Sequence, residues 1–403
     1  MTTTFRFVDL FCGGGGSITG AINALNAAGV TYEGRGFDHW ELAVRTIERN
    51  HPEVVPDFKR ACTPIECVTP DEIFDIDPGR IDFLWASPSC THHSNAAGGK
   101  PRSNQLRSQP EHLLPYLRLT RCRRMFVENV KELREWGPVL DSETTYQGKR
   151  YKAGQADPRK KGLFFNGWLR EIKASGYAVD MTVLNAADYG AATSRERLFI
   201  QAVRKSSGER IIWPEPTHCR TPGLFGLLPW RPAADIIDWS IRGESIFSRK
   251  KPLCANTLRR IGAGIRKYWG TTIEPLFIPQ HTCGEVRPVT GPLSTIATTG
   301  SIGLVRPFLI EYYGSSTTAG VDIPLPTVTT KDRFGVQGVL LPAPEGYRLD
   351  ITHRMLTARE LAAATGFPDG YWFAGGDADA KKQIGNAVPP DPVSALYKAV
   401  LAA

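Results

Sequence analysis

The sequence predicts an α/β fold, in which a sheet carries helices on both faces, joined to a smaller and mostly β domain. Over residues 1–205, short apolar runs alternate with stretches whose apolar residues recur at helical spacing. Over residues 206–349, Pro, Gly and Thr are frequent and helical spacing fades, and it returns over residues 350–403. We therefore expect a first domain at 1–205, a second at 206–349, and a C-terminal segment at 350–403 that rejoins the first.

The composition is that of a globular protein with a basic surface. Of the 403 residues, 41% are hydrophobic and 22% are charged, and the formal net charge of +8 fits a polyanionic partner. No apolar run approaches the roughly 18 residues of a membrane span. The N-terminus lacks a signal-peptide core, so we expect a cytoplasmic location, and we also expect a monomer. The eight cysteines include no CxxC pair, so we expect neither a metal site nor a disulfide framework.

The first α/β unit predicts a nucleoside-binding turn. Residues 5–11 read as a strand, residues 12–17 are Cys-Gly-Gly-Gly-Gly-Ser, and helical spacing follows over 18–25. The turn has neither the GxGxxG spacing nor the P-loop lysine, which favours a nucleoside without a pyrophosphate. A second strand, 34–37, ends at Asp38, where a carboxylate can accept hydrogen bonds from ribose hydroxyls. A helix N-cap is the less favoured role for Asp38.

The strand at 81–86 leads to a candidate nucleophile, Cys90. A buried strand that delivers a cysteine to its carboxyl end is how an α/β enzyme presents a thiol, although a lone cysteine is more often structural. The polar loop at 92–110 follows. It is either a solvated surface loop or a lid that touches phosphates and bases. The candidate DNA-binding residues in it are Ser94, Lys100, Arg102 and Arg107.

Three charged side chains downstream are expected at the same sheet edge. The strand at 124–127 ends just before Glu128, and Arg195 and Arg197 precede the strand at 198–203. If that segment is extended, the two arginines face one side. Taken singly, Glu128 reads as a capping or surface residue and the arginines as a surface pair.

The remaining elements complete the expected first domain. Helices are expected at 39–50, 164–175, 357–365 and 392–401, and a strand at 177–184. Residues 51–80 read as irregular, with a short helix near 70–74, and residues 141–162 read as a loop. Pro389 and Pro390 fix the backbone just after Asn386 and Val388.

The second domain carries +5 of the net charge and a degenerate repeat. Its three copies lie at 252–258, 292–299 and 324–330, and an apolar run follows each. Thr-rich strands with neighbouring basic residues suit a surface that reads a duplex, although a plain β scaffold fits almost as well. The basic residues proposed for DNA contact are Arg259, Arg260, Lys331 and Arg333.

Taken in order, six motifs resemble those of the DNA (cytosine-5) methyltransferase family. They are residues 9–15, 87–91, 128–130, 194–197, 354–360 with 366–368, and 385–390. The sequence departs from the usual Pro-Pro-Cys-Gln nucleophile motif at Ser89 and Thr91, and Thr193 stands in place of the Gln before the arginine pair. The Asp usual after the third strand is not evident, and Cys62 lies nearby.

The resemblance implies a Rossmann-like S-adenosylmethionine-dependent sheet and a target-recognition domain. It implies that Cys90 adds to C6 of a cytosine flipped out of double-stranded DNA, that Glu128 bonds N3 and the exocyclic amine, and that Arg195 and Arg197 hold O2. It names no base for the C5 proton, and a tRNA cytosine-5 methyltransferase and a catalytically silent DNA-binding module are the alternatives. The implied cofactor-binding residues are Phe11, Cys12, Gly13, Gly14, Gly15, Asp38, Asn386 and Val388.

Overall fold

A computed structural model describes most of the two ends of the chain and less of its middle. The described residues are 4–55, 57–65, 81–89, 109–221, 226–241, 244–247, 249–253, 255, 258, 308–311, 318–320, 334–340 and 350–403. The short helix expected near 70–74 and the second and third copies of the repeat lie outside these residues, and the first copy is described only in part. In the part of the chain that is described, no helix is long and apolar enough to cross a membrane.

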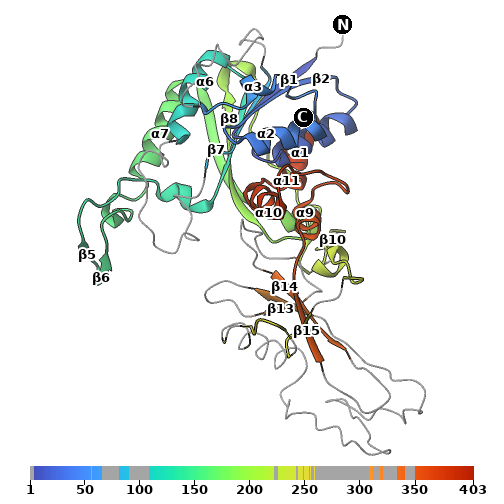
Figure 1. Ribbon diagram of the computed structural model, residues 1–403. Helices are drawn as coiled ribbons and strands as arrows, with labels where there is room; N and C mark the ends of the chain where they lie inside the picture. Colours follow the sequence, from blue (N-terminus) through green and yellow to red (C-terminus); the bar gives the residue numbers. More distant parts are fainter. Residues whose placement is uncertain are drawn as a thin grey trace, which may run out of the picture.

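A six-stranded sheet forms the centre of the main body, in the order β2-β1-β3-β4-β8-β7 (Figure 1). Four neighbouring strands are parallel, while β8 runs antiparallel to β4 and β7 antiparallel to β8. The bounds are β1 (Phe5–Leu10), β2 (Tyr32–Phe37), β3 (Phe83–Ala86), β4 (Arg124–Asn129), β7 (Tyr177–Asn185) and β8 (Glu196–Arg204). Every residue of β3 and β4 is buried, as expected for strands covered on both faces.

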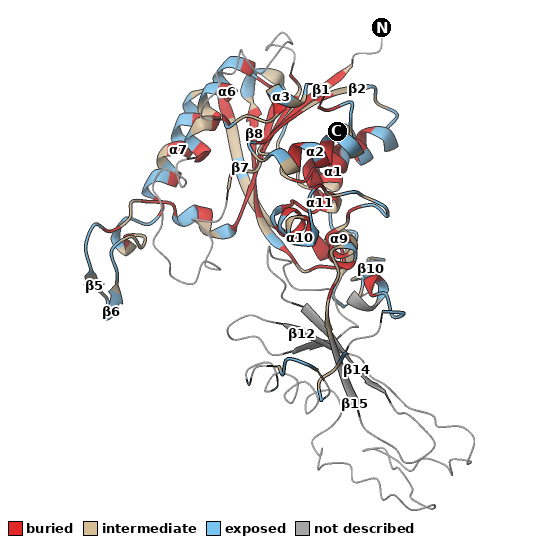
Figure 2. Cartoon of the chain, in the orientation of Figure 1, coloured by how far each residue is buried: buried red, intermediate tan, exposed pale blue. Residues whose placement is uncertain are grey.

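Helices cover both faces of this sheet, which confirms the predicted Rossmann-like α/β fold. Figure 1 shows α1 and α11 on one side and α6 and α7 on the other, and Figure 2 shows the buried residues gathered in the layers between. Tyr397 of α11 stacks on Phe126 of β4, with ring centroids 5.9 Å apart. The bounds are α1 (Gly16–Ala27), α2 (Glu41–Asn50), α3 (Phe58–Ala61), α6 (Leu113–Thr120), α7 (Leu163–Ala174) and α11 (Pro390–Leu401).

Between β4 and α7 the structure contains a β-hairpin where a loop was expected, so that prediction was wrong. Strands β5 (Thr144–Tyr146) and β6 (Lys149–Tyr151) pair antiparallel across Gln147 and Gly148. Both turn residues have positive φ, 48° and 74°, as the tight primed turns of two-residue hairpins require. The strands were overlooked because three-residue strands of polar side chains have almost no apolar alternation.

A second, five-stranded antiparallel sheet contains the later strands, in the order β11-β15-β14-β12-β13. The bounds are β11 (Glu244–Ser245), β12 (Phe308–Glu311), β13 (Thr318–Gly320), β14 (Phe334–Leu340) and β15 (Asp350–Met355). A short parallel pair, β9 (His218–Cys219) and β10 (Leu228–Pro229), precedes it along the chain.

After β15 the chain returns to the main body through two helices, and Glu360 of the first helix makes a capping hydrogen bond and an ion pair. The helices there are α9 (Ala358–Thr365) and α10 (Asp377–Asn386). Glu360 caps α9 through the backbone N–H of Thr357 at 2.8 Å and pairs with Arg354 at 2.7 Å. Residues 350–355 pair with β14 in the second sheet. Residues 209–213, in contrast, bond to the main sheet, for example through Gln201 Nε2, which donates to the Ile212 carbonyl. The domain division at 205 and 349 remains a proposal.

Candidate active site

A pocket of about 140 Å³ lies at the carboxyl ends of β1, β3 and β4. Parallel strands end at one edge of a sheet, and this is where open α/β sheets bind ligands. The pocket brings together ten of the residues that the sequence proposed for the cofactor site or for catalysis. Its lining consists of Phe11, Cys12, Gly13, Gly14, Asp38, His39, Trp40, Ser87, Pro88, Ser89, Gln109, Glu128, Arg195, Arg197, Gln383, Asn386, Ala387 and Val388.

The glycine turn after β1 forms one wall. Phe11 and Gly13 both have positive φ, 62° and 52°, so the chain reverses sharply there. A Cβ added at Gly13 would meet no atom within 4 Å, which leaves space for a ligand against this backbone. Gly15 is placed differently: a Cβ there would lie 2.6 Å from the Tyr371 hydroxyl, so Gly15 packs against the C-terminal segment and does not line the pocket.

Asp38 closes the same wall from the end of β2. Its carboxylate is buried and accepts hydrogen bonds from the backbone N–H of Gly13 at 2.9 Å and of Trp40 at 2.8 Å. These bonds fix the carboxylate against the glycine turn. Trp40 also lines the pocket, and Lys382 Nζ lies 4.1 Å from the centre of its ring.

The turn after β3 is fixed up to the last described residue before Cys90. The backbone N–H of Ser89 donates to the side-chain oxygen of Gln109 at 2.8 Å. Asn129 Nδ2 donates to the Pro88 carbonyl at 2.8 Å, and the Trp85 indole donates to the Ser87 hydroxyl at 2.9 Å. Cys90 follows directly in the sequence but lies outside the described residues, as does the part of the 92–110 loop that precedes Gln109.

Glu128 lies within β4, which extends through Asn129, so the expectation that it sits just past the strand was wrong. It is 7% exposed, and its Oε1 is 3.2 Å from Arg197 Nε. Burial raises the pKa of Glu128 above its ordinary value, against the lowering effect of the charges on Arg197 and Arg195. Both arginines line the pocket, in agreement with the expectation that alternate positions face one side.

The proposed DNA-binding residues cannot be placed. Ser94, Lys100, Arg102, Arg107, Arg259, Arg260, Lys331 and Arg333 all lie outside the described residues. No three His, Cys, Asp or Glu side chains gather as a metal site requires within the described part of the chain.

Sequence reasoning missed several residues of the lining. His39 and Trp40 directly follow Asp38, so their place after the second strand was a usable signal. Gln109 and Gln383 carried no such signal. Gln109 bonds to Ser89, 20 residues earlier, and Gln383 bonds to Thr46, 337 residues earlier.

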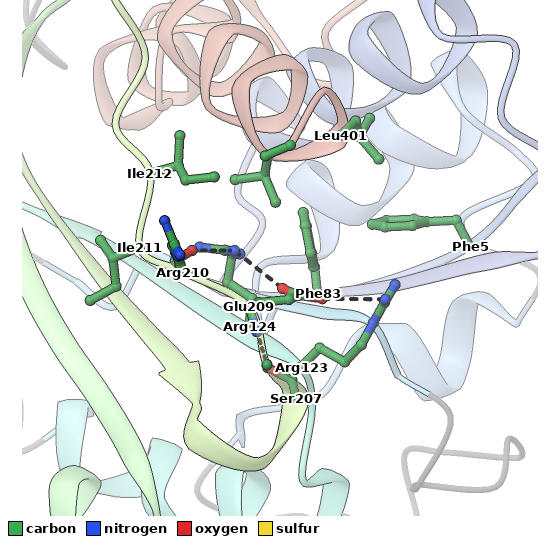
Figure 3. A pocket seen from close by; sticks show the side chains of 13 residues that line it. Phe5, Phe83, Arg123, Arg124, Ser207, Glu209, Arg210, Ile211, Ile212 and Leu401 are labelled. Atoms are coloured by element: carbon green, nitrogen blue, oxygen red, sulfur yellow. Dashed lines mark hydrogen bonds and ion pairs between the residues drawn. The ribbon is translucent and has the colours of Figure 1, made fainter.

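A larger cavity, about 760 Å³, lies at the opposite edge of the sheet and contains none of the proposed site residues (Figure 3). Arg124 there pairs with Glu209 at 3.1 Å, and Arg123 pairs with Asp82 at 2.7 Å. The first pair attaches the segment after β8 to the beginning of β4, and the second joins the residues just before β4 and β3.

Comparison with known proteins gives the family. Residues 156–223 and 315–402 match the family described as C-5 cytosine-specific DNA methylase. The Type II methyltransferase M.AquIA of Picosynechococcus sp. is 30% identical over 251 residues, covering 58% of this chain and 87% of that protein. M.NgoFVII, a Type II methyltransferase of Neisseria gonorrhoeae, is 28% identical over 233 residues, and the match spans only about half of its length, 52%.

The fold has relatives among solved structures. The Entamoeba histolytica methyltransferase EhMeth superposes with a TM-score of 0.55 at 13% identity, over 99% of this chain and 98% of that one. This likeness concerns the fold alone. The family is shown by the sequence matches: the chain belongs to the C-5 cytosine-specific DNA methylase family.

Proposed function

We propose that this protein is a DNA (cytosine-5) methyltransferase. It would transfer a methyl group from S-adenosylmethionine to C5 of a cytosine flipped out of a specific duplex sequence, through a covalent bond between Cys90 and C6. The observation that carries the proposal is a single pocket that joins a glycine turn and Asp38 to Glu128 and its arginines. Relatives named as Type II methyltransferases support the same reading and a restriction-modification context.

The residues at the glycine turn fit S-adenosylmethionine. The open space beside Gly13 would admit a nucleoside against bare backbone, and Asp38 retains acceptor capacity for ribose hydroxyls. Trp40 offers an aromatic surface for the adenine, while Asn386 and Val388 line the part assigned to the methionine. When bound, the cofactor supplies an electrophilic methyl on a sulfonium.

Glu128 is suited to recognise cytosine. Its raised pKa favours a retained proton, which it can donate to N3, while its other oxygen accepts from the exocyclic amine. Thymine has a proton at N3 and no amine, so this pairing selects against it. Arg197 and Arg195 can hold O2, where negative charge develops as the thiolate adds to the ring.

Cys90 would act as the nucleophile. Its thiolate forms a bond to C6, the electron pair moves to C5, and C5 takes the methyl group as the bond from methyl to sulfonium breaks and leaves a neutral thioether. Loss of the C5 proton to a base then expels the thiolate and restores the ring. The bonds made by Gln109 and Asn129 hold the turn that leads to Cys90.

Replacing Cys90 tests the proposal. Cys90→Ala should abolish transfer of tritium from labelled S-adenosylmethionine to duplex DNA, whereas Cys219→Ala, which removes a half-buried cysteine in β9, should not. Full activity of Cys90→Ala would overturn the mechanism. Transfer to tRNA but not to duplex would favour a tRNA cytosine-5 methyltransferase. Absence of any adduct on 5-fluorocytosine DNA in the wild-type protein would favour a silent binding module.

Two further expectations belong to this proposal. We infer that the protein acts as a monomer on DNA in the cytoplasm of a bacterial or phage-infected cell. Sedimentation of the free protein and of its complex with a duplex tests the monomer. Bisulfite sequencing of DNA from cells that express the protein would give the target sequence.

A further inference from the structure

The segment between β4 and α7 forms a projecting arm, residues 138–161, which we call the basic arm. Its tip is the hairpin of β5 and β6. Its root is closed by backbone hydrogen bonds, from Leu140 to the Gln155 carbonyl at 2.8 Å and from Asp157 to the Pro138 carbonyl at 2.9 Å. Figure 1 shows the hairpin standing away from the main sheet and its helices. The arm is thus an ordered two-stranded element.

The outer part of the arm adds nothing to the hydrophobic core. From residue 141 to residue 156, every side chain is exposed or half-buried. An isolated two-stranded hairpin is marginally stable by itself and contributes little to a fold. Packing therefore does not account for its side chains.

The arm is strongly basic, and part of that charge is unpaired within the described structure. Its cations are Lys149, Arg150, Lys152, Arg159, Lys160 and Lys161, against the acids Asp141, Glu143 and Asp157. Arg150 pairs with Glu143, Arg159 with Asp157, and Lys161 with Glu135.

Three exposed lysines remain. Lys149, Lys152 and Lys160 form no ion pair with any described carboxylate. The Lys149 ammonium lies 5.6 Å from the centre of the Tyr151 ring, a contact with an uncharged group that does not neutralise its charge. An exposed cation without a carboxylate partner is available to a polyanion.

The arm starts from the edge of the sheet that holds the pocket. Glu128 and Asn129 end β4, and the root of the arm at Val139 comes ten residues later. Ten residues span at most about 36 Å, which is about ten base pairs of duplex. A duplex with a base in the pocket would therefore pass within about one helical turn of the root.

We propose that the basic arm binds the sugar-phosphate backbone of duplex DNA beside the target base, with Lys149, Lys152 and Lys160 each contacting a phosphate. The proposal rests on the proposed function for its choice of duplex. The arm adds a contact surface outside the pocket. Phosphate contacts position a protein without reading sequence, so the arm would raise affinity for any duplex.

A triple alanine variant tests the arm. Lys149→Ala, Lys152→Ala and Lys160→Ala are combined, and the dissociation constant for a 30-base-pair duplex of random sequence is measured from about 50 to 300 mM salt. Each lost phosphate contact lowers the slope of log K against log salt by about 0.9. We expect the slope to fall by about 2 to 3 and binding at 0.1 M salt to weaken at least about tenfold.

Two matched variants serve as controls. A combined Lys173→Ala, Lys205→Ala and Lys398→Ala variant removes the same charge from exposed lysines near the opposite edge of the sheet, and it should change the slope little. The Lys→Arg triple at the arm positions should bind like the wild type. Thermal unfolding and S-adenosylmethionine binding should not change in any of them.

The outcomes separate the arm from the proposed function. If the two alanine triples lose duplex affinity equally, the effect is one of net charge only and the proposal for the arm is wrong. An unchanged slope of log K against log salt in the arm triple would also contradict it. Weakened binding of tRNA with unchanged binding of duplex would also overturn it. Duplex methylation that does not depend on the arm would contradict only the proposal for the arm. Arm-dependent duplex binding without methyl transfer would contradict only the proposed function.

Discussion

Gln109 should control the turn that leads to Cys90. Its side-chain oxygen accepts a hydrogen bond from the backbone N–H of Ser89, the residue before Cys90. The Ser89 N–H to Gln109 oxygen distance is 2.8 Å, and Gln109 is 8% exposed. Gln109→Ala removes the acceptor and leaves the N–H without that partner. Because Cys90 follows Ser89 directly in the sequence, we expect the turn that leads to it to lose its fixed orientation.

The magnitude follows from the burial of both partners. An unsatisfied buried donor costs about 1–3 kcal/mol, and because Ser89 is only half-buried we take the lower part of that range, about 1–2 kcal/mol. If the loss falls on the productive turn, it corresponds to a decrease of about 5-fold to 30-fold in kcat/KM. The affinity for S-adenosylmethionine should stay within about twofold, since Gln109 acts here through Ser89.

A double-mutant cycle of Gln109→Ala with Ser89→Pro tests whether this hydrogen bond positions the turn. Proline has no N–H, so Gln109 loses its donor in Ser89→Pro, and in the double variant neither partner is left unpaired. We expect Ser89→Pro with Gln109→Ala to transfer methyl groups faster than the product of the single effects predicts, by a coupling of about 1 kcal/mol. Independent, additive effects in kcat/KM would show that the hydrogen bond does not position the turn.

Three further changes have outcomes fixed by the structure. Glu128→Gln should lower kcat by about 10²-fold to 10⁴-fold and flatten the alkaline limb of the pH–rate profile. The wild type should lose activity as pH rises through the raised pKa of Glu128, whereas glutamine does not titrate. An unchanged limb would assign it to another group. Asp9 is buried, and burial raises its pKa well above the ordinary value. The folded state therefore keeps a proton that the unfolded state loses at about pH 4. The free energy of unfolding then falls as pH rises from about 4 toward the folded pKa. Asp9→Asn should therefore gain stability over the wild type in urea unfolding more at pH 8 than at pH 5, and an equal difference at both would contradict this. Gly20→Ala places a Cβ 2.4 Å from the Pro390 carbonyl, so overpacking between α1 and α11 should cost about 1–3 kcal/mol, and an unchanged urea midpoint would show that the helices separate freely.

The part of the site that sequence predicts follows from one topological rule. The carboxyl ends of neighbouring parallel strands meet at one edge, so Asp38 after β2 and Glu128 in β4 come together once the strand order is right. Arg195 and Arg197 join them because β8 runs antiparallel to β4 and begins at the same edge. For such residues, position along the chain is enough to place them in space.

Other residues of the site depend on packing that leaves no local pattern. Gln109 accepts the Ser89 N–H although it lies 20 residues later in the sequence, and a single glutamine there has many alternative roles. The helix α10 was missed because its sequence is polar and ends in Gly385 and Asn386, so its formation depends on burial against α9. Gly15 shows the opposite error: it belongs to a ligand-binding motif, but its missing Cβ makes room for Tyr371.

The far end of the chain packs directly against the glycine turn and supplies part of the pocket lining. Gln383 of α10 lines the pocket, and its oxygen accepts from Thr46 of α2 at 2.6 Å while its nitrogen donates to the Ala374 carbonyl at 2.9 Å. Thr46 in turn accepts from the backbone N–H of Ala374 at 2.9 Å. These buried bonds join segments more than 300 residues apart, so the pocket is complete only after the C-terminal segment docks. A ligand that contacts both the glycine turn and the C-terminal segment would therefore stabilise that docking, and its binding would be thermodynamically linked to closure of the fold.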